Sequence, residues 1–305
     1  MSKIQVNKLH TLTGHNQSIF ALAEGVSPNY FYSGDGQGMV VEWDLEKPKN
    51  GKLLAKLSNS VYALFVDKES QLLFIGENFE GLHVVDLKQK KEDWSLKITS
   101  SAIFDIKCRA DQLFVATGDG VLVVLDIHEK SPLKHIKVAN DSLRVIALSP
   151  NRDIMAIGCS DNTIKVFELP SFEPIANLKG HTNSVFALDF SPDGRHLISG
   201  GRDAHLRVWN TGDFSLAKDI AAHMYAINFL DFREDGKYFV TCSMDKSIKL
   251  WDAQTFKLLK VIDKARHAGH GTSINKIIWS SYQGQIVAVS DDRTLSIWDI
   301  EFSSI

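Results

Sequence analysis

The sequence has few cysteines and no long apolar run. Its 305 residues include three cysteines, Cys108, Cys159 and Cys242, and no two of them are spaced as a C-x-x-C pair. This usage suits a reducing compartment and small buried thiols. No apolar stretch has the length of a transmembrane helix, and the first residues lack the apolar segment of a signal peptide. We therefore expect a soluble, cytoplasmic protein.

A large excess of charge and the common catalytic motifs are also lacking. The formal net charge is −3 at pH 7, so nothing indicates electrostatic binding of nucleic acid. There is no G-x-x-x-x-G-K-[ST] phosphate loop and no G-x-S-x-G nucleophile elbow, and segment 34–38 is interpreted as a turn. His267 and His270 are three residues apart, but the repeat pattern gives His270 a structural role. We therefore expect no metal site and no cofactor.

What the sequence does contain is a repeated unit of short strands. In the clearest copy, residues 180–210, an alternating apolar segment at 185–190 is followed by a turn at 191–194 and two further strands that end near Trp209. Period-two alternation interrupted by Gly, Pro and Asp is typical of an antiparallel meander. One such sheet cannot bury both of its faces, so it needs neighbours of its own kind.

Seven copies of this unit fill the chain. The closing residues recur about every 40–45 residues, and the most regular copies begin with Gly-His and end with Trp-Asp. The closing positions are Trp43, Val85, Leu125, Phe167, Trp209, Trp251 and Trp298. This pattern resembles the WD-repeat β-propeller family, which implies an all-β fold of seven blades, each a four-stranded antiparallel sheet. The resemblance covers nearly the whole chain and implies a single domain over residues 1–305.

The two ends of the chain are expected to share one blade. Residues 8–12 precede Gly14-His15 as an outer strand precedes the later Gly-His pairs, but no three strands come before them. The last copy, in turn, has three strands and no fourth. The resemblance therefore implies that the N-terminal strand completes the last blade and closes the ring, which removes exposed sheet edges.

In the WD-repeat family a His, a Ser or Thr, an Asp and a Trp of one blade form a buried hydrogen-bonded network. Blades five and six match every position. Blade one has Gln37 where the Asp is expected, blade seven has Ala288 at the hydroxyl position, and blades two to four lack the His. The residues that the resemblance assigns to the network are His181, Ser199, Asp203 and Trp209 in blade five, His223, Thr241, Asp245 and Trp251 in blade six, His15, Ser33 and Trp43 in blade one, and His270, Asp292 and Trp298 in blade seven.

A Ser, a His and an Asp in one unit could also form a nucleophilic triad, which needs an exposed hydroxyl beside a base. Here the trio recurs in register with the repeat, whereas catalysis needs only one site. We therefore expect a structural role and no catalytic residue. Removing one member of a buried network of this kind costs about 1–3 kcal/mol.

Two positions in every repeat are expected to surround the opening at one face of the propeller. The resemblance places one at the entry of each first strand and the other just before the turn Asp. Aromatic and Arg side chains, which are enriched in binding hot spots, are frequent among them. The alternative is that some of these rings fill the channel or pack between strands. The candidate partner-binding residues are Phe20, Tyr62, Phe104, Arg144, Phe186, Asn228, Asn275, Arg202, Met244 and Asp291.

The last repeat interval is longer than the others because of extra residues in segment 262–269. This segment joins an outer strand to the next inner strand, so we expect it on the same face as the aromatic rim. Its basic residues Lys264, Arg266 and His267 could meet an acidic partner. The alternative is an ordinary solvated loop.

These features predict a monomeric, non-catalytic scaffold that binds proteins or peptides at its rim, alone or within a multiprotein complex. An arginine, lysine or aromatic side chain of a peptide would anchor against the rim aromatics. One alternative is an enzyme with its active site at the channel mouth, which would need exposed acids and His on the rim. A third function, RNA binding through Arg144, Arg202 and the stacking rings, is less compatible with the net charge.

Overall fold

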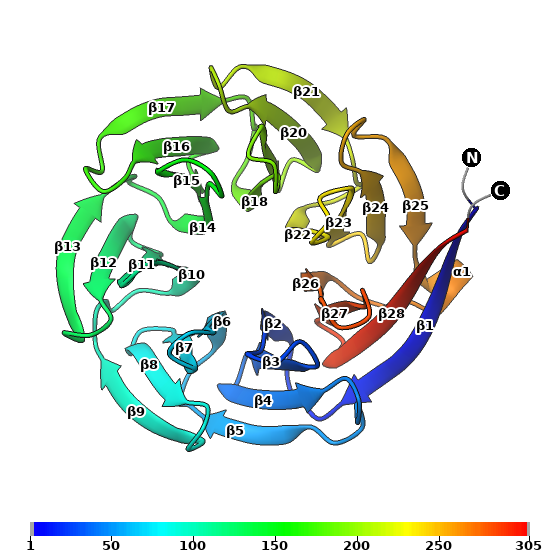
Figure 1. The fold of residues 1–305 in the computed structure, drawn as a ribbon, viewed down its shortest axis with the longest axis horizontal. Helices are drawn as coiled ribbons and strands as arrows, with labels where there is room; N and C mark the ends of the chain where they lie inside the picture. Colours follow the sequence, from blue (N-terminus) through cyan, green and yellow to red (C-terminus); the bar gives the residue numbers. More distant parts are fainter. Residues whose placement is uncertain (1–2, 304–305) are drawn as a thin grey trace.

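The computed structural model describes residues 3–303, which form a ring of seven four-stranded antiparallel sheets (Figure 1). In six of the sheets the strand order follows the chain from the centre of the ring outward. The innermost strands therefore surround one axis, and the fourth strands form the circumference. The all-β, seven-bladed propeller predicted from the repeats is confirmed.

The seven blades follow the chain around the ring. Blade one contains β2 (Ile19–Glu24), β3 (Tyr30–Asp35), β4 (Met39–Asp44) and β5 (Lys52–Lys56), and blade two contains β6 (Val61–Asp67), β7 (Leu72–Glu77), β8 (Gly81–Asp86) and β9 (Lys91–Leu96). Blade three contains β10 (Ile103–Arg109), β11 (Gln112–Thr117), β12 (Val121–Asp126) and β13 (Ser131–Lys137), and blade four contains β14 (Leu143–Leu148), β15 (Ile154–Cys159), β16 (Thr163–Glu168) and β17 (Pro174–Lys179).

Blade five contains β18 (Val185–Phe190), β19 (His196–Gly201), β20 (His205–Asn210) and β21 (Leu216–Ala221), and blade six contains β22 (Ile227–Phe232), β23 (Tyr238–Ser243), β24 (Ile248–Asp252) and β25 (Leu258–Ile262). Blade seven is built from both ends of the chain, with β26 (Ile274–Trp279), β27 (Ile286–Ser290), β28 (Thr294–Ser303) and β1 (Lys3–Thr13).

The hydrophobic core lies between adjacent sheets. Leu206 and Val208 of blade five, for example, pack in one cluster with Ile227, Leu230 and Trp251 of blade six. All five side chains are almost completely buried. Each blade therefore hides its apolar faces against its two neighbours, and this burial is the main stabilising contribution.

Blades two to four lack the His of the family network and depend on the same apolar packing. In β12 the consecutive residues Leu122, Val123, Val124 and Leu125 are each at most 1% exposed. A continuous apolar run of this kind is typical of a strand that is buried on both faces. Apolar packing on both faces therefore holds this strand in its blade.

Every innermost strand carries one β-bulge near its start. In β18 the ladder with β19 pairs Val185 with Gly201 and Ala187 with Gly200, which leaves Phe186 without a partner. A bulge of this kind turns a side chain away from the regular face of the sheet. The unpaired residues at the seven bulges are Phe20, Tyr62, Phe104, Arg144, Phe186, Asn228 and Asn275.

The N-terminal strand closes the ring as predicted. β1 pairs with β28 in antiparallel register from Lys3 opposite Ser303 to Thr13 opposite Thr294. Leu12 of β1 is 2% exposed and packs with Ile19 and Trp43 of blade one. The closing strand therefore contributes to the core between blades seven and one as well as to the hydrogen-bond ladder.

Segment 262–269 contains the short helix α1 (Lys264–His267), which Asp263 caps by accepting a 2.8 Å hydrogen bond from the backbone of Arg266. The Nζ of Lys8 donates to the carbonyl of Ala268 at 2.7 Å. Figure 1 shows α1 at the circumference beside β1 and β25. The segment starts and ends on the side of the ring where the innermost strands begin, but its helix lies away from the axis.

Among the residues that the structure describes, α1 is the single helix, and no helix has the length and apolar character needed to cross a bilayer.

Candidate partner-binding site

The predicted networks are present in blades five and six. His181 lies 3.0 Å from Asp203 through Nδ1 and 2.8 Å from the hydroxyl of Ser199 through Nε2, and the indole N–H of Trp209 donates to the same hydroxyl at 2.9 Å. In blade six the corresponding distances around His223 and Thr241 are 2.8, 2.7 and 2.9 Å. Each network joins the loop before a blade to its second and third strands.

Blade one corrects the prediction that its network lacks an Asp. The Nδ1 of His15 lies 2.9 Å from Oδ2 of Asp35, and Nε2 lies 2.6 Å from the hydroxyl of Ser33, which also accepts from Trp43 at 2.8 Å. Asp35 is the last residue of β3, two positions before Gln37. The backbone N–H of Gln37 donates to Oδ1 of Asp35 at 2.9 Å, so Gln37 supports the carboxylate instead of replacing it.

Blade seven likewise has a complete network despite Ala288. The hydroxyl comes from Ser296, which lies 2.7 Å from Nε2 of His270 and accepts from the indole N–H of Trp298 at 2.8 Å. Ser296 of β28 is the cross-strand partner of Ala288 in β27. Because directly opposite residues point to the same face of an antiparallel sheet, either position can place a hydroxyl near the His.

The electrostatics of these networks favour the ionised form of their Asp side chains. Burial alone would raise the pKa of Asp203, but hydrogen bonds and charge from His181 and Arg207 outweigh it and hold the pKa below its ordinary value. Burial lowers the pKa of His223. In blade six an ionised Asp245 therefore accepts the Nδ1 proton of a neutral His223, whose Nε2 accepts from the hydroxyl of Thr241.

The hydroxyls of these networks are inaccessible to a substrate. Ser33, Ser199, Thr241 and Ser296 are each 0% exposed. A nucleophile must reach its substrate, so a hydroxyl sealed in this way does not meet the requirement for a catalytic triad. Their hydrogen bonds satisfy buried polar groups and hold the strands of each blade together.

The seven bulge residues meet at one end of the axis. Together with Lys276 they line a cavity of about 390 Å³, which we call the axial pocket. The structure thus brings together seven of the ten predicted rim residues, one from each blade. The bulges explain this convergence, because each one redirects a side chain of an innermost strand toward the axis.

An aromatic row and a stacked arginine form the wall of the axial pocket. The rings of Phe20 and Tyr62 are 4.8 Å apart between centroids, and those of Tyr62 and Phe104 are 5.8 Å apart. The guanidinium of Arg144 lies 4.2 Å from the centroid of Phe104 and 5.5 Å from that of Phe186, within the range of cation–π attraction. Its Nε donates to the hydroxyl of Ser160 at 2.8 Å.

The two amides in the pocket wall connect neighbouring blades. Asn228 of blade six donates to the carbonyl of Ile274 in blade seven at 2.8 Å, and Asn275 of blade seven donates to the carbonyl of Ile19 in blade one at 2.9 Å. These bonds make the two amides structural clamps between innermost strands. The other lining residues of the axial pocket are aromatic or cationic.

Lys276 was not among the predicted site residues. It directly follows the bulge residue Asn275, at a position that is Ala21, Ala63 and Ala187 in blades one, two and five. The lysine at a position where other blades have an alanine was the signal in the sequence that could have identified this residue. Its Nζ lies 4.2 Å from the ring centroid of Phe229, and burial lowers its pKa.

Three predicted rim residues lie outside the axial pocket, in the turns between second and third strands. Arg202 is exposed, and Met244 is 54% exposed. The carboxylate of Asp291 accepts from Asn275 at 2.7 Å, so it borders the pocket through that amide. These three residues lie on the same face of the propeller as the axial pocket but do not line it.

Charged groups from several blades continue along the axis below the pocket. Asp105 accepts from the backbone N–H of Ile146 in blade four at 2.8 Å, and Asp231 accepts from that of Trp279 in blade seven at 2.6 Å. Burial raises the pKa of Asp189 to about 6 and that of Asp231 to about 7. Lys107 of blade three interacts electrostatically with all three carboxylates.

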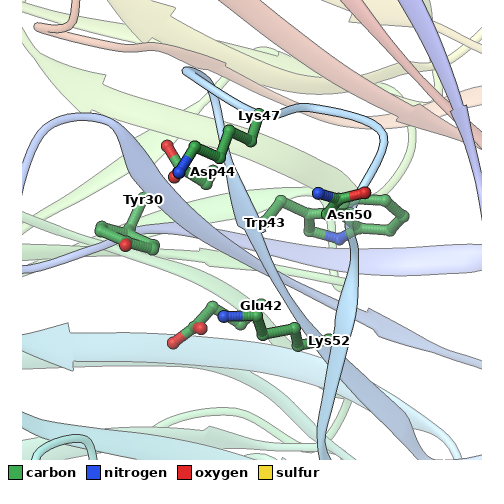
Figure 2. Close-up of a pocket in the computed structure, with 7 residues that line it drawn as sticks. All are labelled: Tyr30, Glu42, Trp43, Asp44, Lys47, Asn50 and Lys52. Carbon is green, nitrogen blue, oxygen red and sulfur yellow. The ribbon is translucent and has the colours of Figure 1, made fainter.

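A second cavity, of about 230 Å³, is confined to blade one. Figure 2 shows its seven lining residues, which come from the start of β3, the end of β4 and the segment that leads into β5. Trp43 contributes to the wall of this cavity, although its indole N–H donates to the hydroxyl of Ser33. The cavity involves one blade, whereas the axial pocket involves all seven.

Two of the three cysteines are buried free thiols. Cys159 and Cys242 are buried and unpaired, and burial raises the pKa of Cys159 to about 12. Within residues 3–303, no group of three or more His, Cys, Asp or Glu side chains has an arrangement that could hold a metal ion.

Comparison with family models gives five matches to the WD40 model, described as WD domain, G-beta repeat. The matched residues are 6–44, 130–168, 172–210, 214–252 and 261–299, which together cover more than half of the chain. The protein therefore belongs to the WD40 family, whose propellers typically serve as protein-interaction scaffolds. None of the curated proteins compared with this chain matches it. The segment between the first two matches contains blade two and the first three strands of blade three, and both blades lack the network His.

Proposed function

We propose that this protein is a monomeric, non-catalytic cytoplasmic scaffold that binds a peptide segment of another protein in the axial pocket. The observation that carries the proposal is the convergence of four aromatic rings and Arg144 from five different blades on one cavity. Aromatic and Arg side chains dominate the energetics of protein interfaces. Because the closed ring holds these side chains in place, a partner would bind with little loss of conformational freedom at the site.

The charge of the pocket favours an acidic anchor on the peptide. Arg144 already occupies the faces of Phe104 and Phe186. Lys276 adds a second cation, which also interacts electrostatically with Asp105 and Asp231. A guest arginine or lysine would compete with Arg144 for the rings and meet charge of its own sign. A Glu or Asp side chain, with an apolar or aromatic neighbour, is complementary to both cations.

The alternatives receive less support from this geometry. The eight residues that line the axial pocket include no carboxylate and no imidazole, which are the groups that act most often as general acids or bases. The surrounding face is mixed in charge, with Asp119 and Asp141 exposed on blades three and four and Arg202 exposed on blade five. Binding to RNA favours a continuous basic surface, so a mixed face favours a peptide.

The proposal is tested with a variant that combines Phe104→Ala, Phe186→Ala and Arg144→Ala. Partners captured by the wild-type protein should bind this variant more than about 30-fold more weakly, because truncating one hot-spot residue costs about 2 kcal/mol or more. Arg233→Ala is a matched control, since Arg233 also stacks on aromatic rings but follows the opposite end of an innermost strand.

Recovery of the same partners by the triple variant would show that the axial pocket is not the binding site. A short single-stranded RNA, added to both proteins in a fluorescence assay, tests the third function. RNA binding that disappears in the triple variant would replace the peptide proposal with the RNA alternative.

A further inference from the structure

Exposed apolar side chains are concentrated on blade six, on the face of the axial pocket. Met224 is 81% exposed, Tyr225 is 60% exposed and Met244 is 54% exposed. The first two lie in the loop before β22, and the third lies in the turn between β23 and β24. These two segments are joined by hydrogen bonds from Ser243 to the carbonyl of Tyr225 at 3.2 Å and from the N–H of Met244 to the carbonyl of Ala226 at 2.9 Å. We call the three side chains the blade-six patch.

Two exposed cations flank the blade-six patch. Lys246 is in the same turn as Met244, and Arg202 is in the adjacent turn of blade five. That turn contacts the patch loop, because the carbonyl of Ala204 accepts from the N–H groups of Ala222 and His223 at 3.1 and 3.2 Å. Within residues 3–303, the side chains of Arg202 and Lys246 make neither a hydrogen bond nor an ion pair.

The acidic groups beside these cations are already engaged inside the blades. The side chain of Asp203 is 5% exposed and is bonded to His181 and Arg207. The side chain of Asp245 is 8% exposed and is bonded to His223. The blade-six patch is therefore bordered by uncompensated positive charge, although the whole chain carries a formal net charge of −3.

We infer that the blade-six patch is a docking surface for an acidic amphipathic segment of a partner protein. Its apolar side chains would cover Met224, Tyr225 and Met244, and its Asp or Glu side chains would face Arg202 and Lys246. Clustered exposed apolar residues mark interaction sites in soluble proteins, and flexible Met side chains adapt to different apolar partners. The flanking cations select an acidic segment over a basic one. This surface is separate from the axial pocket and does not depend on the function proposed for it.

The two methionines of the blade-six patch provide a direct test. In protein labelled with ¹³C at the methionine methyl groups, Met224 and Met244 report on the patch, while the buried Met155 and the half-buried Met39 serve as internal controls. The probe is a synthetic peptide with Leu and Phe among Glu residues. Two control peptides replace either Glu by Lys or Leu and Phe by Ser. The acidic apolar peptide should shift the signals of Met224 and Met244 and leave those of Met39 and Met155 unchanged.

Charge-reversed variants complete the test. Arg202→Glu together with Lys246→Glu should weaken binding of the acidic peptide about tenfold, because charges of one sign then face each other. Arg144→Ala should leave the shifts of Met224 and Met244 unchanged. The inference is wrong if the acidic peptide shifts neither methionine, if the Lys or Ser peptide binds equally well, or if charge reversal has no effect. Shifts that disappear only in Arg144→Ala would instead assign the binding to the axial pocket.

Discussion

At the scale of single residues, each network needs a carboxylate and a hydroxyl close to its His. These groups can come from other positions of the repeat than the family pattern uses. In blade one the carboxylate comes from Asp35, and in blade seven the hydroxyl comes from Ser296. Both residues lie on strands next to the position that the family pattern uses. The chain can therefore exchange network positions between blades without leaving a buried donor unpaired.

Replacing Ser296 by Ala should destabilise the protein by about 1–3 kcal/mol, because His270 and the indole N–H of Trp298 would both lose their buried partner. The free energy of unfolding, measured by urea denaturation, gives the loss. The double variant Ser296→Ala with Ala288→Ser places the hydroxyl at the cross-strand position used in the other blades. It should recover most of the stability. Equal stability of the single variant and the wild type would contradict the assigned hydrogen bonds.

Arg144 shows how one side chain changes the chemistry expected of a pocket. The sequence predicts that the rim aromatics accept an arginine, lysine or aromatic side chain of a peptide. In the structure the guanidinium of Arg144 lies over Phe104 and Phe186. The cation is thus supplied by the protein, which leaves an anion as the complementary guest.

At the scale of strands, the β-bulge and the closing strand are the two features with consequences for function. A regular innermost strand would alternate its side chains between the two faces of its blade. The bulge interrupts this alternation at one residue, and the seven interruptions produce the axial pocket. β1 keeps the ring closed, and a closed ring is what holds seven separate strands around one cavity.

Removal of residues 1–12 should open the ring between blades seven and one. The loss exposes the edge of β28 and deletes the buried side chain of Leu12. We expect a lower melting temperature and rapid proteolysis of β28. A synthetic peptide of residues 1–13, added to the truncated protein, should restore part of the melting temperature, whereas a scrambled peptide should not. An unchanged melting temperature after truncation would show that β1 is not needed for closure.

At the scale of the whole molecule, the ring brings charged residues of several blades to its axis. Lys107, Asp189 and Asp231 belong to blades three, five and six and interact electrostatically. Asp231 is buried near another carboxylate, so its neutral form is favoured in the folded protein. In the unfolded chain an Asp titrates near its ordinary pKa of about 3.9.

This difference predicts the effect of Asp231→Asn on stability as a function of pH. With a folded-state pKa of about 7, Asp231 binds a proton more tightly in the folded state, so its contribution to stability falls as pH rises from about 4 to 7. The Asn variant keeps an oxygen that can accept from Trp279 but does not titrate. The melting temperature of the variant minus that of the wild type should therefore increase between pH 4 and 8.

The exposed residue Asp141 provides the control for this experiment. The melting temperature of Asp141→Asn minus that of the wild type should change little over the same pH range. A difference for Asp231→Asn that is also independent of pH would contradict the raised pKa and the crowding of carboxylates at the axis.

The sequence by itself determined the number of blades, the closure by β1 and the seven residues at the mouth of the axis. The number of blades follows from periodicity, because a sheet that repeats in the sequence must repeat in space to bury its faces. The closure and the seven mouth residues follow from the resemblance to the WD-repeat family. Only the tertiary structure decided that Asp35 and Ser296 supply the carboxylate and the hydroxyl that Gln37 and Ala288 lack. It also decided that Arg144 stacks on the aromatic rings and that Lys276 lines the axial pocket. Those facts depend on which side chains come together across strands and between blades, and the spacing of residues along the chain does not determine these particular contacts.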